Sequence, residues 1–155
     1  MHEGVDFLYE AVANSLEAGA RQVEVTYKSY KTEVEVLVID DGKDDILASC
    51  FEEGISGKSN HAGLGLSLLK ERTEGKVKLE KVGNSTKLWY LIKKDQNYGH
   101  LSSVLPLIFA MLENQTLKFT YIKDEMIQVI DSQAFSTLYE TSSIIHIRNL
   151  VQSWD

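Results

Sequence analysis

The sequence predicts an α+β protein, and three observations support this class. Some segments place apolar residues at steps of three and four, which is the spacing of an amphipathic helix. Other segments alternate apolar and polar residues, as strands with one buried face do. These strands come in adjacent pairs, and antiparallel hairpins backed by helices form an α+β fold.

The first elements are a helix and a hairpin. Apolar residues recur at helical spacing over residues 5–18, and Gly19 is a natural stop for that helix. Residues 22–40 then alternate apolar and polar positions twice, on either side of a polar turn near 29–32. We therefore expect a hairpin with one buried face. The apolar positions of the helix are Val5, Leu8, Val12 and Leu16.

A long loop, a second helix and a second hairpin follow. Residues 41–62 lose all periodicity and collect Gly, Ser, Asp and Lys. Long loops inside compact domains are usually functional, so we expect a mobile lid over 43–62. Helical spacing then returns, with Leu64, Leu68 and Leu69 expected to face inward. The second pair of strands is expected over residues 76–83 and 86–94.

The rest of the chain predicts a smaller helix–hairpin–helix unit. We place a boundary in the polar stretch before Tyr98 and divide the chain into residues 1–95 and a small α+β extension over residues 96–155. The last helix carries a stripe of apolar residues, which we expect to dock on its own unit; a surface for a protein partner is the alternative. The stripe consists of Ile144, Ile147, Val151 and Trp154. The other elements expected here are a helix over 101–113, strands over 117–122 and 126–131, and a short helix after Ser132.

Composition excludes several classes of function. Sixteen Lys and Arg against 23 Asp and Glu give a net charge of −7, which disfavours a nucleic-acid surface. Cys50 is the only cysteine, so we expect neither a disulfide framework nor a zinc cluster. We see no signal peptide and no apolar run long enough to span a bilayer, and we expect a cytoplasmic protein that does not bind membranes.

Two polar residues of the first helix are the first candidate for a site. Glu10 and Asn14 are four residues apart, so they project from the same side of the helix. A carboxylate and a carboxamide in this arrangement can serve as a general base and as a ligand for a hard cation such as Mg²⁺. A solvated helix face is the alternative for the pair alone.

The second candidate is the end of the first hairpin, "VIDDG". Asp40 ends an apolar strand, where a carboxylate can accept a hydrogen bond from an exocyclic amino group such as adenine N6. Gly42 would let the backbone approach a flat ring closely. The alternative is an ordinary exit from a strand into a turn.

The third candidate lies in "GKSNHAGLGLSLL". Gly63 and Gly65 stand at the expected start of a helix, where free N–H groups and the helix dipole attract phosphate, and Lys58 could add a positive charge. The spacing fits neither a Walker A loop nor a Rossmann fingerprint. A plain helix entrance is the alternative.

Taken together, "EAVANSLEAGA", "VIDDG" and "AGLGLSLLKE" resemble the N box and the two glycine boxes of the GHKL superfamily. That group includes gyrase-type topoisomerases, a heat-shock chaperone, sensor histidine kinases and mismatch-repair ATPases. The resemblance covers about residues 5–93. It implies a Bergerat-type ATP-binding fold, which is a two-layer α/β sandwich whose mixed, mainly antiparallel sheet has helices on one face. It also implies ATP and Mg²⁺ as the bound cofactors.

The resemblance implies a role for each matching residue. Glu10 matches the general base that polarises the attacking water, and Asn14 matches the Mg²⁺ ligand. Asp40 matches the carboxylate that accepts adenine N6–H, and Ala18 matches a small residue packed against the nucleotide. The other matching positions are Gly42 in the first glycine box, Lys58 in the lid, Gly63, Leu64, Gly65 and Leu66 around the phosphates, and Thr86 near adenine.

The sequence also departs from the family pattern. Asp44 and Ser85 stand where glycines are common, and Asp44 changes the expected path of the lid. The dimerising N-terminal strap and the following domain with its catalytic lysine are not recognised in this sequence. Without these completing groups, the resemblance implies slow turnover, because phosphoryl transfer depends on positioned charges around the γ-phosphate.

Three functions agree with these motifs. The leading hypothesis is a Mg²⁺-dependent ATPase with Glu10 as the base. The second is a protein phosphotransferase, either an anti-sigma-type serine kinase or the ATP-binding half of a split sensor histidine kinase. The third is a nucleotide sensor without catalysis, in which ATP orders the lid. In each case we expect an adenine nucleotide as ligand and a protein partner that contacts residues 96–155 or the lid.

Overall fold

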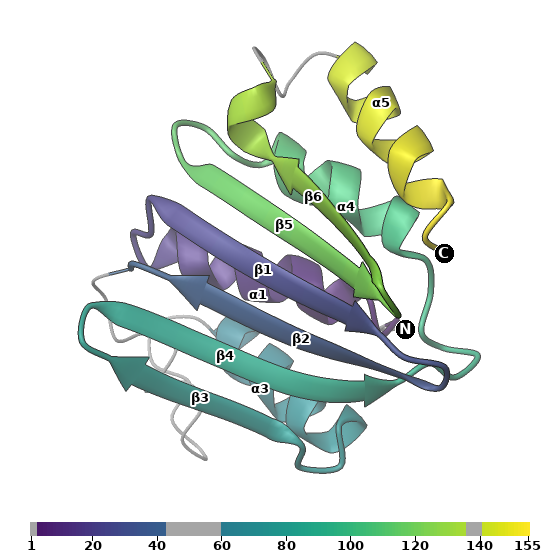
Figure 1. Ribbon diagram of the computed structural model, residues 1–155. Helices are drawn as coiled ribbons and strands as arrows, with labels where there is room; N and C mark the ends of the chain where they lie inside the picture. Colours follow the sequence, from purple (N-terminus) through teal and green to yellow (C-terminus); the bar gives the residue numbers. More distant parts are fainter. Residues whose placement is uncertain (1–2, 43–59, 136–140) are drawn as a thin grey trace.

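The computed structural model describes residues 3–42, 60–135 and 141–155, with the backbone alone for 60–65 and 141–142. Its strands form one mixed six-stranded sheet in the order β3-β4-β2-β1-β5-β6 (Figure 1). Only the β1–β5 pair among these strands is parallel; the other four pairs are antiparallel. The strands are β1 (Gln22–Ser29), β2 (Glu33–Asp40), β3 (Val77–Val82), β4 (Ser85–Lys93), β5 (Thr116–Lys123) and β6 (Met126–Asp131).

The helices cover one face of this sheet and leave the other face open (Figure 1). Helices α1 and α4 contact each other, as do α1 with α3 and α4 with α5. The α+β class predicted from the sequence is confirmed, with one layer of helices on one layer of strands. The helices are α1 (Asp6–Glu17), α3 (Asn60–Arg72), α4 (Leu101–Ala110) and α5 (Thr141–Gln152), with a 3-10 turn η1 (Ser132–Ala134).

The first hairpin forms as its alternating pattern predicts. Val25 of β1 pairs with Val38 of β2, and both side chains are buried on the helical side of the sheet. Each fully buried valine contributes on the order of 1.5–3 kcal/mol relative to an exposed one. A one-residue slip of the register would turn these valines outward, so their burial fixes the pairing.

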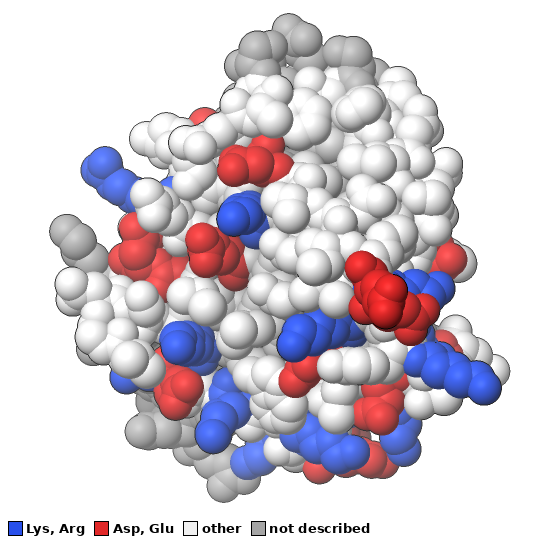
Figure 2. All heavy atoms as spheres, viewed as in Figure 1, with Lys and Arg blue, Asp and Glu red and all other residues white. Residues whose placement is uncertain are grey.

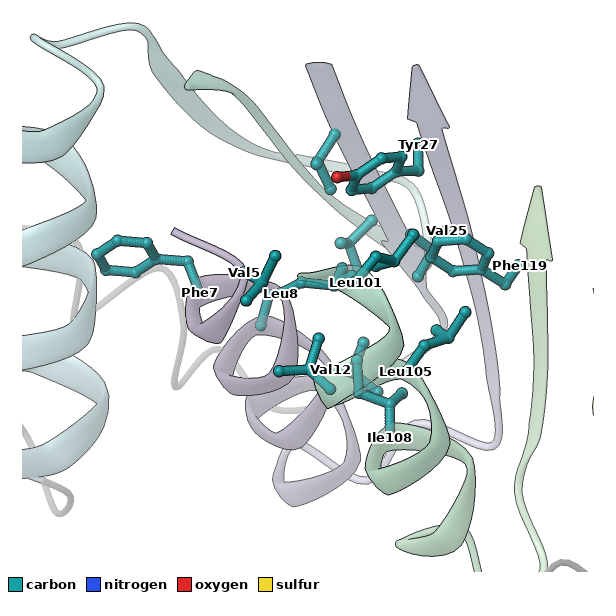
Figure 3. Close-up of a cluster of buried hydrophobic side chains, with 14 of the residues drawn as sticks. Val5, Phe7, Leu8, Val12, Val25, Tyr27, Leu101, Leu105, Ile108 and Phe119 are labelled. Carbon is teal, nitrogen blue, oxygen red and sulfur yellow. The ribbon is translucent and has the colours of Figure 1, made fainter. Parts of the chain in front are cut away.

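The core lies between the sheet and helices α1 and α4. In Figure 3, Leu8 and Val12 of α1, and Val5 just before it, lie beside Leu105 and Ile108 of α4. The strands supply Val25, Tyr27 and Phe119 to the same cluster.

Helix α1 ends where its sequence predicts. Gly19 has a φ of +86°, a conformation in which an L side chain is strained. The Ala20 N–H donates to Ser15 O at 3.1 Å and the Gly19 N–H donates to Leu16 O at 3.1 Å, so the last carbonyls of the helix have partners.

The C-terminal segment adds its strands to the same sheet. Strand β5 pairs in parallel with β1, with Val25 opposite Phe119, and β6 pairs with β5. Helix α4 ends at Ala110, three residues earlier than predicted, because the chain turns there to enter β5. Leu112 is still buried, although it lies beyond the helix.

The apolar stripe of the last helix docks on its own unit, as predicted. Ile147 and Val151 are buried, and Trp154 stacks on Tyr121 of β5 with the ring centroids 4.6 Å apart. Phe119 also stacks on Trp154 and lies against Tyr27 of β1. The residues after 95 therefore share one core with those before it.

Part of the open face of the sheet is charged. Figure 2 shows Lys and Arg side chains interspersed with Asp and Glu there, beside a large area with neither. Trp89 of β4 is half buried there, and its indole N–H donates to Glu35 Oε2 at 2.7 Å. Among the described helices, none is both long enough and apolar enough to cross a membrane.

Candidate functional site

The centre of the candidate site is the carboxylate of Asp40, at the end of β2. The residue is only 3% exposed. Ser15 Oγ donates to Asp40 Oδ2 at 2.6 Å, and the Gly42 N–H donates to Oδ1 at 2.8 Å. Each carboxylate oxygen has two acceptor positions, so the two bonds fix the group without using its full capacity.

Three other predicted residues lie around Asp40. Thr86 is directly opposite Asp40 in the β2–β4 pair, and Thr86 is buried as well. A Cβ atom placed on Gly42 would lie 3.1 Å from the carbonyl oxygen of Ala18 and 3.2 Å from its Cβ. The structure therefore brings Ala18, Asp40, Gly42 and Thr86 together, as the sequence motifs predict.

Ser15 is a site residue that the motifs did not assign. It lies on α1, seven residues after Leu8 and three after Val12, so it belongs to the apolar stripe of that helix. A serine in such a stripe must find a partner when it is buried. This position in the pattern was the signal that could have predicted its bond to a buried acceptor.

Asp41 connects the end of β2 to the beginning of β1. Its Oδ1 accepts hydrogen bonds from the backbone N–H groups of Arg21 at 2.8 Å and Gln22 at 3.0 Å. Partial burial raises the pKa of Asp41, but the bonds from Gln22 and Arg21 outweigh it and the pKa lies below its usual value. The charged form of Asp41 is therefore favoured in the folded state.

Glu10 and Asn14 lie together, as predicted, but in a partly enclosed place. Both line a small hollow between α1 and α3, and Leu66, Leu69 and Leu88 form its apolar side. The Oε2 atom of Glu10 is buried. This pair is therefore not a fully solvated helix face, which was the alternative for its spacing.

The carboxylate of Glu10 also acts on a buried phenol. Burial, followed by the charges of Tyr98 and Glu10, raises the pKa of Tyr90 well above its ordinary value. Glu10 is thus close enough to the core to influence the titration of a residue on β4.

The segment Gly63–Leu66 differs from the prediction in its local structure. Helix α3 begins at Asn60, before the start predicted at Gly63, so Gly63 and Gly65 lie inside its first two turns. The sequence predicted a start at Gly63 because residues 41–62 lack helical periodicity. In the structure, the helix buries the side chains of Leu66 and Leu69.

The inward face of α3 also differs in part from the prediction. Leu69 is buried and Leu68 is only partly buried, whereas Leu66, which was predicted as a phosphate-wrapping residue, is 5% exposed and belongs to the core. The side chain of Leu64 and the whole of Lys58 and Asp44 lie outside the described part of the chain.

The metal prediction concerns Asn14 alone. No group of three or more His, Cys, Asp or Glu side chains that could hold a metal ion occurs among the described residues. Mg²⁺ commonly keeps several waters and takes one or two protein ligands together with substrate phosphates. The carboxamide of Asn14 fits that mode of binding, with the metal held mainly by a phosphate-bearing ligand.

The site has two ends along α1. Ser15 holds Asp40 near the C-terminal end of the helix, and Glu10 lies five residues earlier, which corresponds to roughly 7.5 Å of helix rise. One end offers a fixed, buried acceptor for an N–H donor. The other offers a carboxylate and a carboxamide beside Leu66 and Leu69, in the middle of α3.

Comparison with known proteins shows similarity of fold. No family model and no curated protein matches the sequence. One similar solved structure is described as the N-terminal domain of a DNA repair protein, with a TM-score of 0.54 and 15% identity. The match covers 83% of this chain and 51% of that one, so this chain spans about half the length of that structure. At this identity the likeness concerns the fold alone.

Proposed function

We propose that this chain binds ATP with Mg²⁺ and hydrolyses it slowly, on a fold of the Bergerat type. The observation that carries the proposal is the buried carboxylate of Asp40, fixed by Ser15 and Gly42 and flanked by Ala18 and Thr86. An ionised carboxylate is costly to bury unless it is hydrogen-bonded, and here the bonds leave acceptor positions for a ligand.

At this end of the site, Asp40 recognises the adenine base. Its remaining acceptor capacity takes the N6–H of adenine, while guanine presents an oxygen acceptor at the equivalent position. Gly42 lies so close to Ala18 that a Cβ atom at position 42 would be crowded. Without a Cβ atom, the backbone at this position can approach the adenine ring closely.

At the other end, Glu10 and Asn14 act on the phosphates. Asn14 is the protein ligand of Mg²⁺, which supplies positive charge to the phosphate oxygens when it is bound. Glu10 accepts a proton from the water that attacks the γ-phosphorus as the bond to the ADP oxygen breaks. Of the predicted segment 63–66, only Gly63 lies among the first four residues of α3, whose N–H groups have no partner within the helix. In this proposal that N–H and the Lys58 side chain complete the phosphate contacts.

Calorimetric titration with ATP, ADP and GTP, with and without Mg²⁺, tests the base recognition. A charged acceptor that faces guanine O6 costs on the order of 2–3 kcal/mol, so ATP is expected to bind at least tenfold more tightly than GTP. Asp40→Asn should abolish this preference. The control is Asp41→Asn, because Asp41 is the adjacent carboxylate and accepts from the backbone N–H groups of residues 21 and 22. Equal affinity of the parent protein for ATP and GTP would contradict the site.

A second experiment separates catalysis from binding. Glu10→Gln keeps the shape of the side chain but removes the base, so ATP affinity should persist while phosphate release falls by roughly 100-fold or more. Glu17→Gln, an exposed position on the same helix, is the matched control and should hydrolyse at the parent rate. Unchanged turnover in the Glu10 variant would show that this carboxylate is not the base.

A further inference from the structure

A second cavity lies at the opposite end of the sheet from Asp40. Its volume is about 210 Å³. Ser29, at the end of β1, and Lys94, just after β4, both line it, whereas Asp40 is paired with the beginnings of those two strands. In Figure 1 the β1 arrowhead and the β2 arrowhead point to opposite sides of the molecule. The cavity is therefore separate from the candidate nucleotide site.

The walls of this cavity are aromatic and largely buried. Tyr27, Tyr98 and Trp154 line it, and each is less than a tenth exposed. The hydroxyl groups of Tyr27 and Tyr98 lie 2.5 Å apart and share a hydrogen bond. Two hydroxyls joined by one bond retain one hydrogen that is not used between them, so the pair can still donate to a third group.

Lys94 is the only Lys or Arg among the residues that line the cavity, and His100 lines it as well. Lys94 Nζ donates to Ser29 Oγ at 2.6 Å, and no carboxylate of the described residues forms an ion pair with it. Burial, followed by the charge of Lys123, lowers the pKa of Lys94. An ammonium group has three donors, so an anion beside Lys94 would satisfy donors that Ser29 does not use and would offset the cost of burial.

The two carboxylates that line the cavity already have partners. Asp155 accepts hydrogen bonds from the N–H and the hydroxyl of Ser102, in the first turn of α4. Asp95 Oδ1 accepts from the Asn97 N–H at 2.8 Å and lies 3.9 Å from a guanidinium nitrogen of Arg72. These negative groups remain near enough to disfavour a ligand with two or more negative charges.

The loop of residues 97–99, beside the cavity, is fixed by hydrogen bonds from residues 4 and 5. The Val5 N–H donates to Tyr98 O at 2.8 Å, and the Gly4 N–H donates to Asn97 O at 2.9 Å. Gly99 has a φ of +85°, and a Cβ atom there would lie 2.9 Å from Val5. The cavity is thus formed before any ligand binds, which lowers the entropic cost of binding.

We propose that this cavity binds a small organic molecule with one carboxylate and a planar apolar body. The carboxylate sits beside Lys94 and accepts from the tyrosine hydroxyl pair, and the body lies against Trp154 and the tyrosine rings. The ammonium group of Lys94 matches a single negative charge, and the neighbouring aspartates disfavour a phosphate dianion. The proposal is independent of ATP binding at Asp40.

The test uses benzoate as the probe and the two tryptophans as reporters. In a titration of the ¹⁵N-labelled chain, the indole N–H signal of Trp154 should shift and saturate, while that of Trp89 on the open face should stay in place. The variant Trp89→Phe assigns the two signals. Benzamide has nearly the same shape without the charge, and inorganic phosphate has the charge without the ring, so both should bind much more weakly.

Two lysine variants decide the role of the cation. Lys94→Gln should weaken benzoate binding roughly tenfold or more, since it removes a charged hydrogen bond. Lys93→Gln is the matched control, because Lys93 is exposed and lies 3.6 Å from Glu74. An unmoved Trp89 signal shows that each variant is folded, and Asp40→Asn should leave benzoate binding unchanged. The proposal is overturned if benzoate does not shift Trp154, if benzamide or phosphate binds equally well, or if Lys94→Gln binds like the parent.

Discussion

At the scale of single residues, the candidate site depends on one buried charge and the groups that hold it. Asp40 is fixed through one oxygen by Ser15 and through the other by the Gly42 N–H. A serine hydroxyl and a backbone amide are both neutral donors, so the negative charge stays on the carboxylate. A salt bridge would instead have neutralised it, and the carboxylate would have less to offer a ligand.

Ser15→Ala should therefore weaken both the fold and the site. The variant leaves one carboxylate oxygen buried without the donor it has now, which costs on the order of 1–3 kcal/mol. Urea denaturation should show a lower midpoint with an unchanged slope. Ser103→Ala is the control, because Ser103 is exposed on α4 and should change stability by less than about 0.5 kcal/mol. A Ser15 variant as stable as this control would mean that the bond to Asp40 contributes nothing net.

At the scale of elements, most of the fold could be predicted from the sequence. Strands β1 and β2 alternate strictly, so their faces and their turn follow directly from the spacing of the valines. The start of α3 could not be predicted, because the residues before Gly63 show no apolar periodicity that would mark a helix. The parallel pairing of β5 with β1 joins residues 94 positions apart, and no local sequence pattern predicts it.

Likewise, only part of the candidate site could be predicted from the sequence. Asp40 and Gly42 follow from their places at the end of a strand that the sequence marks clearly, whereas Thr86 follows from the family resemblance alone. Ser15 was missed because its role depends on the distance between a helix and a strand end, which only the packed structure fixes. Lys58 stays a prediction, since it lies outside the described residues.

The connection between β2 and β1 gives a pH-dependent prediction. The pKa of Asp41 is lower in the folded state than its model-peptide value of about 3.9, so its contribution to stability is present above that value. This contribution is lost as the pH falls through the folded pKa. Asp41→Asn should lower the free energy of unfolding near pH 7, and the difference from the parent should shrink as the pH falls below about 4. A difference that is constant with pH, measured by urea titrations, would contradict the role of the charge.

At the scale of the whole molecule, the two segments on either side of residue 95 are joined by one sheet and one core. Trp154 stacks on Tyr121 and Phe119 of β5, and Phe119 lies against Tyr27 of β1. A continuous chain of aromatic contacts thus runs from the last residues of the chain to the centre of the sheet. Small proteins with one core usually unfold in a single transition.

Trp154→Ala tests this coupling, because it removes the outermost ring of that chain of contacts. The loss is expected to cost about 3–5 kcal/mol, the usual range for a buried tryptophan or phenylalanine replaced by alanine. Trp89 on β4 then remains as the only tryptophan, at the far side of the sheet from the change. If the segments unfold together, the fluorescence of Trp89 and the far-UV circular dichroism should shift to the same lower midpoint in urea. The exposed Leu107→Ala on α4 should leave both midpoints in place. A circular dichroism transition that moves while the Trp89 transition does not would show that residues 96–155 unfold as a unit of their own.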